Sequence, residues 1–482
     1  MAEKIIDFGI IFLLIYTPLA IGGGSEFSVM LLETMSGVLF VVWLVKIFAR
    51  RHRSSHHHRV HDSHSNHDHH QGYSIHLATS PLFVPFCLFC GVIVGQLIPL
   101  PSALVNTLSP HTYQLYTEWA SYTGATIPNW LPVTIYAHAT EGELYKFLAY
   151  AALFVVIINT MRSQPQQKRI IYTIITVGLL EALYSFAQFS GYHLPYLKPD
   201  QANWLASGTF LNRNHLAGYL EMVIPLTCGV LFLCLGKSGP FPLKRLMALF
   251  DEQYLKALLI LFLIGVMICA LLLSGSRGGM LSFAASMIFL CLLAFMRRGL
   301  RKWALVVMIF LLLTLGVALL SSPERAIKRL DALTKPDTEQ SFTYRKDVWQ
   351  NSLLIWRDFP IFGSGLGSFA HIFRRYQGFV SDLFFAYAES DYVQLVVETG
   401  IVGTLLMFWL GILFFYRTIV AWKQRRSRWT MTMAAAGLSA VFSLCIHSGV
   451  DFNLHVPSNA VTFTVIAALS YVAAHTHRKS KR

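Results

Sequence analysis

The sequence is poor in charged residues. Only 13% of its 482 residues are Asp, Glu, Lys or Arg, whereas 54% are hydrophobic. The apolar residues form runs longer than the roughly 20 residues that a helix needs to cross a bilayer. Such a composition excludes an ordinary soluble domain, so the sequence predicts an all-α, polytopic membrane protein.

Cysteine is scarce, and its positions exclude two further classes of protein. All seven cysteines fall inside the apolar runs, so neither a disulfide framework nor a thiolate metal site is indicated. No cleavable signal peptide is expected either. The first apolar run, IIDFGIIFLLIYTPLAIG, is long enough to span a membrane, and another span follows it at once.

The apolar runs predict about twelve spans within a single transmembrane domain over residues 1–482. Their centres fall near residues 14, 38, 91, 154, 180, 226, 265, 288, 312, 405, 438 and 466. With both termini inside, 26 of the 39 Lys and Arg residues lie inside and 13 outside, which is the bias of the positive-inside rule. The pI of about 9.5 then requires no nucleic acid as a partner, because basic loops beside anionic membrane lipids explain it.

Two connections between spans are long enough to be considered by themselves. The inside loop 49–72 contains RRHRSSHHHRVHDSHSNHDHH, with nine of the nineteen histidines. Its composition is typical of a metal-binding tract, but we favour a flexible polar cytoplasmic loop without a catalytic role. The outer segment 322–392 combines helix-like periodicity in YRKDVWQNSLLIWRDF with the Gly-rich PIFGSGLGSF, and we expect it to form a helical cap over the bundle.

Two arginines stand at expected outer starts of spans. Arg277 lies in LLLSGSRGGMLSF, and Arg213 precedes Asn214 and His215 in SGTFLNRNHLAGYLEM. A helix start offers free N–H groups and the positive end of the helix dipole, and a guanidinium adds a bidentate partner for phosphate. The two arginines therefore suit a diphosphate at the membrane surface. The structural alternative is that each one snorkels to the interface or pairs with a carboxylate.

Carboxylates enter the predicted membrane in AYAESDYVQLVVETG, at Glu389, Asp391 and Glu398. A partly desolvated carboxylate at this depth has the properties of a general base toward a hydroxyl. The structural alternative is a helix N-cap at Ser390 or Asp391, with Glu398 at an ordinary interface.

A third polar cluster lies in HSGVDFNLHVPSN. His447, Asp451 and His455 share one face if the segment is helical, although Gly449 and Pro457 indicate that part of it is a turn. We favour a hydrogen-bonded wall of a cavity over a metal site, because His and Asp satisfy each other without a metal.

Taken together, these motifs resemble the O-antigen ligase and Wzy-type O-antigen polymerase superfamily of bacterial membrane glycosyltransferases. The resemblance rests on LPVTIYAHAT, SGTFLNRNHLAGYL, SGSRGGMLS, YRKDVW with PIFGSGLGSF, ESDYVQLVVETGIVG and HSGVDFNLHVPSNA, in that order. It implies a GT-C-like fold in the inner membrane and a glycan donor linked to undecaprenyl diphosphate. It also implies metal-independent, cofactor-free transfer to an acceptor hydroxyl at the periplasmic face.

The resemblance also assigns roles to particular residues. Arg277 matches the family's S-R-G arginine, a proposed diphosphate contact, and Arg213 is the nearest arginine after the G-T-F motif, which here lacks the arginine that usually precedes it. Glu389 and Ser390 stand where ligases often have His-Asn, so Glu389 is our candidate base, with Asp391 as an open alternative. The expected sugar site is lined by Asn214, His215, Tyr392, Asp391, His447, Asp451 and His455.

Three alternatives for the activity stay open: two reactions of this superfamily, and the activity of another class of protein. The Glu-Ser pair favours a polymerase, with a chain-length regulator as a further expected partner, over a ligase that transfers glycan to lipid A core or protein. A secondary or divalent-cation transporter is the rival class. No pair of Gly/Pro-broken spans marks inverted repeats, and Glu33, Glu181 and Glu221 are the few carboxylates expected near mid-membrane.

Overall fold

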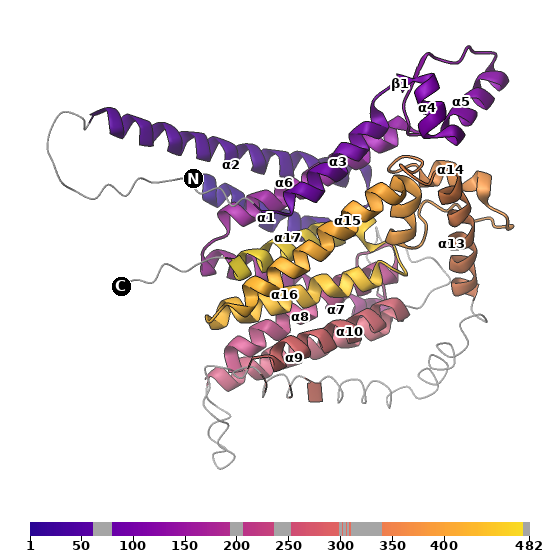
Figure 1. The fold of residues 1–482 in the computed structure, drawn as a ribbon. Helices are drawn as coiled ribbons and strands as arrows, with labels where there is room; N and C mark the ends of the chain where they lie inside the picture. The colour runs from indigo at the N-terminus through magenta and orange to yellow at the C-terminus, as the bar shows by residue number, and fades with distance from the viewer. Residues whose placement is uncertain are drawn as a thin grey trace.

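The protein is an all-α bundle with a small two-stranded sheet (Figure 1). The computed structural model describes residues 1–60, 80–192, 206–235, 252–297 and 340–475, together with residues 301, 305, 308 and 309. Residues 61–70 of the His-rich tract and residues 322–339 lie outside these ranges. The described elements, in chain order, are α1 (Ala2–Leu19), η1 (Ile21–Gly23), α2 (Glu26–Val60), α3 (Phe83–Leu97), β1 (Leu100–Pro101), α4 (Ser102–Leu108), α5 (Pro110–Thr123), β2 (Trp130–Leu131), α6 (Ala137–Thr160), α7 (Gln164–Phe189), α8 (Arg213–Leu235), α9 (Glu252–Ser274), α10 (Arg277–Phe295), α13 (Gln340–Asp358), α14 (Phe369–Tyr376), α15 (Asp391–Lys423), α16 (Arg428–His447), η4 (Asn453–His455) and α17 (Pro457–His475).

Eight of the described helices are long and apolar enough to cross a membrane: α2 over Glu26–Ala49, α7, α8, α9, α10, α15, α16 and α17. The predicted all-α polytopic fold is therefore confirmed. The count of about twelve spans is not confirmed: the helices that hold the expected centres near 14, 91 and 154 (α1, α3 and α6) are not among the eight, and the centre near 312 lies outside the described residues. Every other expected centre falls within a helix.

The bundle is organised around α8 and α17, which are the most deeply buried of these helices. α8 packs against α16, α9, α10 and α7, and α17 packs against α16, α6 and α15. Large apolar side chains such as Leu258 and Phe262 of α9 are exposed on the outside of the bundle. Outward-facing apolar side chains suit helices that are surrounded by lipid tails.

A cap covers one end of the bundle (Figure 1). We use this name for β1, α4, α5, β2, α13 and α14, and we call the bundle end beside them the cap end. The two parts of the cap come from segments far apart in the chain. Arg375 of α14 binds Glu118 of α5 through two N–O contacts of 2.7 and 3.1 Å, and Leu115 of α5 packs against the apolar cluster of α13 and α14. These two segments, 100–131 and 340–376, therefore form one unit.

The opposite end of the bundle is held together by contacts between helix ends. Trp429 Nε1 at the start of α16 donates to Gln167 Oε1 at the start of α7, at 2.7 Å. Arg297, just after α10, donates to the carbonyl of Trp422 near the end of α15 at 2.6 Å. These contacts show that the helices alternate in direction, so α8, α10 and α17 all begin at the cap end.

A kink in α15 fits the loop between α13 and α14 against the bundle. Gly400 has φ +62° and ψ −165°, and a Cβ at this position would lie 2.4 Å or less from the carbonyl of Ile361, so only glycine fits. Two residues earlier, the buried Glu398 accepts a hydrogen bond of 3.0 Å from the N–H of Phe369, the first residue of α14. Glu398 therefore caps a helix and fixes the cap to α15.

Candidate functional site

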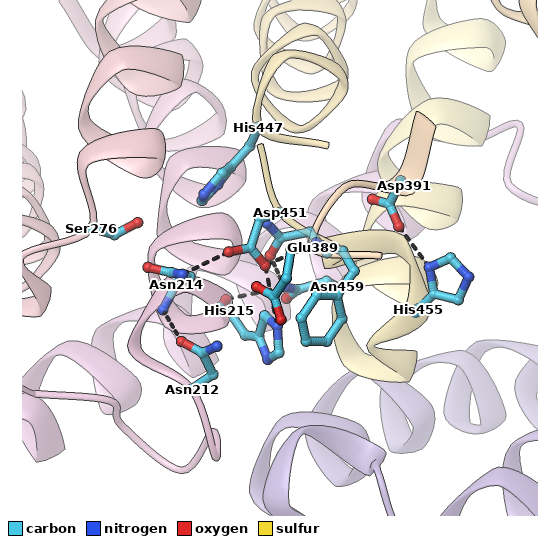
Figure 2. A network of polar contacts seen from close by, with 12 residues as sticks. Asn212, Asn214, His215, Ser276, Glu389, Asp391, His447, Asp451, His455 and Asn459 are labelled. Carbon is cyan, nitrogen blue, oxygen red and sulfur yellow. Dashed lines mark hydrogen bonds and ion pairs between the residues drawn. The ribbon is translucent and has the colours of Figure 1, made fainter. Parts of the chain in front are cut away.

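A network of polar side chains lies at the cap end, where the starts of α8, α10 and α15 meet the turn between α16 and α17 (Figure 2). Asp451 is at its centre and is fully buried. Asn214 Nδ2 donates to Asp451 Oδ2 at 2.6 Å, and Arg345 Nη2 donates to the same oxygen at 3.0 Å. His215 Nε2 lies 3.4 Å from Asp451 Oδ1. The start of α8 and α13 thus converge on the carboxylate of Asp451, which lies in the turn between α16 and α17.

The charge state of Asp451 follows from these contacts. Burial by itself would raise the pKa of Asp451, but the hydrogen bond and charge of His215 and the charges of His447 and Arg345 outweigh it and hold the pKa at about 2. The carboxylate is therefore ionised and accepts hydrogen bonds on both oxygens. A carboxylate with so low a pKa is a poor proton acceptor, which suits Asp451 to holding neighbouring side chains in place.

Glu389 lies beside Asp451 and shares its arginine. Arg345 Nε is 3.4 Å from Glu389 Oε2, and the Glu389 side chain is 27% exposed. Burial raises the pKa of Glu389, while the charge of Arg345 acts in the opposite direction. A carboxylate that is partly buried, partly accessible and raised in pKa has the properties of a general base near neutral pH.

The backbone at Glu389 has an unusual conformation. Its φ is +54°, a left-handed value that few residues other than glycine adopt. The next residue, Ser390, is the N-cap of α15, and its hydroxyl accepts from the N–H of Val393. The expected N-cap at Ser390 is therefore present. A strained residue next to a fixed helix start is a pattern that clusters at functional sites.

Asp391, the alternative base, has other partners. Its Oδ1 is 2.7 Å from His455 Nδ1, and its Oδ2 accepts a hydrogen bond of 3.0 Å from the N–H of Leu454. Burial acts to lower the pKa of His455, but the hydrogen bond and charge of Asp391 raise it overall. Figure 2 shows the pair to one side of the Asn214–Asp451–Glu389 cluster. Both Asp391 oxygens thus fasten the turn before α17 to the start of α15.

The three residues of the HSGVDFNLHVPSN cluster do not share one helix face. α16 ends at His447, Asp451 lies in a bend and His455 belongs to η4, so the indication of a turn was correct. The three side chains contact three different carboxylate or cationic partners: His447 contacts Glu221 at 3.2 Å, Asp451 contacts Arg345 and His455 contacts Asp391.

The two predicted arginines are the first residues of their helices. α8 begins at Arg213 and α10 at Arg277, and both helix starts lie at the cap end. Ser276 caps α10 by accepting from the N–H of Gly279 at 3.2 Å. A Cβ at Gly279 would lie 2.5 Å from the Cβ of Ala217, so the first turns of α8 and α10 are packed side by side. Arg277 is also within electrostatic range of Arg345.

The G-T-F motif forms the loop that leads into α8. Glu181 of α7 accepts hydrogen bonds from the N–H of Thr209 at 2.9 Å and from its hydroxyl at 2.7 Å. Gly208 has φ +62°, and a Cβ there would lie 2.5 Å from Glu181 Oε2. The motif therefore needs glycine for space and threonine for hydrogen bonds, and Glu181 anchors the loop.

Tyr392 has a contact that its sequence position did not reveal. Its hydroxyl donates to the carbonyl of Cys445 near the end of α16, and its ring lies 5.5 Å from that of Phe408. The hydroxyl is therefore engaged with the bundle itself.

Sequence reasoning missed Arg345, the residue that joins Glu389 to Asp451. It lies on α13, in the YRKDVW segment, among several basic residues of the long outer segment. The only local signal was that this segment belongs to the resemblance. Asn212, Asn453 and Asn459 were also missed. Asn212 accepts from the N–H of Asn214 at the start of α8, and Asn459 of α17 donates both to the carbonyl of His215 in α8 and to Asn453 in the turn before α17.

In the described part of the chain, no group of three or more His, Cys, Asp or Glu side chains is placed to hold a metal ion. The side chains of residues 50–79, which hold the His-rich tract, lie outside the described set.

The fold and the site define a polytopic membrane protein with a polar site at one end of its bundle. Residues 262–408 match the family model described as O-antigen ligase, which confirms the resemblance to the O-antigen ligase and Wzy-type superfamily. The match contains Arg277, Arg345 and Glu389, and it supports a membrane enzyme of O-antigen assembly that acts on lipid-linked glycan. A search of curated proteins finds no match.

Proposed function

We propose that the protein transfers a glycan from undecaprenyl diphosphate to an acceptor sugar hydroxyl at the periplasmic face of the bacterial inner membrane. In this proposal both termini and the loop 49–72 are cytoplasmic, and the cap, with residues 322–392, is periplasmic. The observation that carries the proposal is the convergence, at one end of the bundle, of two helix starts bearing Arg213 and Arg277 with a carboxylate, Glu389, that is held by a third arginine.

The helix starts suit the leaving group. The N–H groups at the starts of α8 and α10 and the positive ends of both helix dipoles attract an anion. Arg277 and Arg213 would bind the diphosphate oxygens, with Arg345 close by. Negative charge grows on the diphosphate as the sugar–oxygen bond breaks, and donors already in place stabilise that charge.

Glu389 suits the acceptor. Its carboxylate takes the proton from the acceptor hydroxyl, and the hydroxyl oxygen then attacks the anomeric carbon from the face opposite the leaving group. The bond from that carbon to the diphosphate oxygen breaks, undecaprenyl diphosphate leaves, and the configuration inverts. Arg345 orients Glu389, and Asp451, held by Asn214 and His215, orients Arg345.

Of the two reactions, we propose the polymerase, which joins glycan repeats on their lipid carrier. The Glu389–Ser390 pair in place of His-Asn supports this choice over transfer to lipid A core or protein. A chain-length regulator would be a further partner of a polymerase.

The test is transfer in vitro by the purified protein, with undecaprenyl-diphosphate oligosaccharide from the source organism, in EDTA. A ladder of lengthening lipid-linked glycans is expected. A single product, formed only when lipid A core is added, would instead establish a ligase. The absence of transfer to either acceptor by well-folded protein would overturn the proposal, and metal uptake by proteoliposomes would then test the transporter alternative.

A further inference from the structure

A buried pair of ionisable side chains lies beneath the proposed diphosphate site and takes no part in the chemistry above. His447 Nδ1 is 3.2 Å from Glu221 Oε1, and the two side chains are 1% and 0% exposed. The pair joins α16 to α8 inside the apolar bundle, where ionisable side chains are costly and are usually functional.

The imidazole of His447 lies against the first turn of α10. A Cβ at Gly278 would lie 2.9 Å from both Nε2 and Cδ2 of His447, and a Cβ at Gly279 would lie 3.4 Å from its Cε1. Glycine at position 278 is therefore what allows the ring to lie against the backbone, while position 279 leaves room for an ordinary contact with it. Figure 2 shows His447 between the α10 start, marked by Ser276, and Asp451.

From this geometry we infer that Glu221 and His447 are positioning residues that set the place of Arg277. Glu221 holds the ring from α8, the helix that begins with Arg213. The ring supports the start of α10, and Arg277 immediately precedes Gly278. The inference rests on the proposed function, because it assigns the pair to the diphosphate site of the same reaction.

The rate of glycan transfer should depend strongly on the contact between His447 and Gly278, because Arg277 is the residue next to Gly278. A change at Gly278 that displaces the first turn moves the guanidinium with it. A misplacement of about 1 Å in a catalytic geometry costs about 100-fold in rate. The pair thus determines rate through geometry, without touching substrate.

The test compares Gly278→Ala, His447→Ala and the double variant. The added methyl group should push against the ring in Gly278→Ala and lower kcat about 100-fold, with KM for the acceptor unchanged. In the double variant the clash with the ring is removed and only the clash with Val450 Cγ2, also at 2.9 Å, remains, so kcat should exceed that of Gly278→Ala alone. Gly411→Ala is the matched control, because it adds a Cβ to a membrane helix where nothing lies within 4 Å, and it should leave kcat unchanged.

Glu221 supplies a second test that a purely structural role would not satisfy. Glu221→Gln keeps an oxygen that accepts from His447 Nδ1, so it should retain kcat within about tenfold. Glu221→Ala loses that acceptor and should lower kcat toward that of Gly278→Ala while the protein remains monodisperse. Equal loss in Gln and Ala variants, or a kcat in the double variant equal to the product of the two single losses, would overturn the inference.

If the proposed function is wrong, the results differ from those expected when only the positioning role is wrong. If wild type transfers no glycan, the contact is read from thermal unfolding of the same variants. If the change in Tm of the double variant differs from the sum of the changes in the two single variants, the His447–Gly278 contact is supported. Additive changes in Tm contradict it. If wild type is active but Gly278→Ala matches it in both kcat and Tm, the positioning role alone is wrong.

Discussion

Arginines meet helix ends at both ends of the bundle, but the helix ends have opposite polarity. Away from the cap, Arg297 donates to the carbonyl of Trp422 at 2.6 Å and lies 4.6 Å from the centroid of its ring, while Arg425 donates to the carbonyl of Ala474. These carbonyls lie in the last turns of α15 and α17, the negative ends of the helix dipoles, where a cation is stabilising.

At the cap end, the arginines stand at the positive ends of helices. Arg213 and Arg277 are the first residues of α8 and α10, where a cation is unfavourable by roughly 0.3–1 kcal/mol. A bound diphosphate would reverse the sign of this interaction. The comparison teaches that the helix end at which an arginine stands distinguishes a structural arginine from one that suits an anionic ligand.

The largest effect on kcat is expected from two carboxylates that pair with arginines, one at each end of the bundle. Glu389 pairs with Arg345 at the cap end, and Asp7 pairs with Arg169 at the opposite end. Glu389→Gln should lower kcat for glycan transfer by about 10²- to 10⁴-fold, because it removes a general base. Asp7→Asn should leave kcat near that of wild type. Comparable losses in both variants would show that carboxylate–arginine pairs act only through the fold.

The next largest effect on kcat is expected from the arginines themselves, compared between the two ends of the bundle. Arg277→Ala should lower kcat about 100- to 1,000-fold through lost stabilisation of the leaving group. Arg297→Ala should leave kcat unchanged but lower Tm, since a hydrogen bond from a charged donor is worth about 1.5–3 kcal/mol. Steady-state kinetics and thermal unfolding of the two purified variants check this, and the opposite pattern would refute the comparison.

The pH dependence of kcat, and its change in an Arg345 variant, tests whether Glu389 is the general base. Glu389 must be ionised to accept a proton, and burial raises its pKa, so activity should fall on the acid side at a higher pH than for an ordinary glutamate. Arg345 acts to lower this pKa, so Arg345→Gln should move the acidic limb of the kcat profile to still higher pH. A limb that stays in place would exclude Glu389 as the base.

Asp451 has the smallest predicted effect, and it is on stability. Its pKa falls from 3.8 to about 2 in the folded protein, which corresponds to about 2 kcal/mol. For an acid with a lowered pKa, this contribution is present above pH 3.8 and disappears as the pH falls toward 2. The difference in Tm between wild type and Asp451→Asn should therefore shrink over that range, and a constant difference would contradict the assignment.

Much of the fold was predictable because it depends on local pattern. Apolar run length located the helices, and the S-G-S-R-G-G segment carried both the N-cap, Ser276, and the start of α10. The site depended on contacts between distant segments. Arg345 meets Asp451 across 106 residues of sequence, and nothing local separates it from the other cations of the outer segment.

Two further features were beyond sequence reasoning for the same physical cause. Glu221 was recognised only as a carboxylate near mid-membrane, since its partner His447 comes from another helix 226 residues later. The left-handed backbone at Glu389 stands two residues before Asp391, whose N–H donates to the carbonyl of Ser448 in the distant turn after α16, whereas the residue type itself disfavours that conformation.

The most direct test of the central claim is a structure of the protein with bound undecaprenyl diphosphate. The account predicts that the diphosphate lies between the starts of α8 and α10, within hydrogen-bonding distance of the Arg277 guanidinium and of N–H groups in the first turn of α10. A diphosphate bound elsewhere, with the Arg277 and Arg213 side chains away from it, would contradict the account.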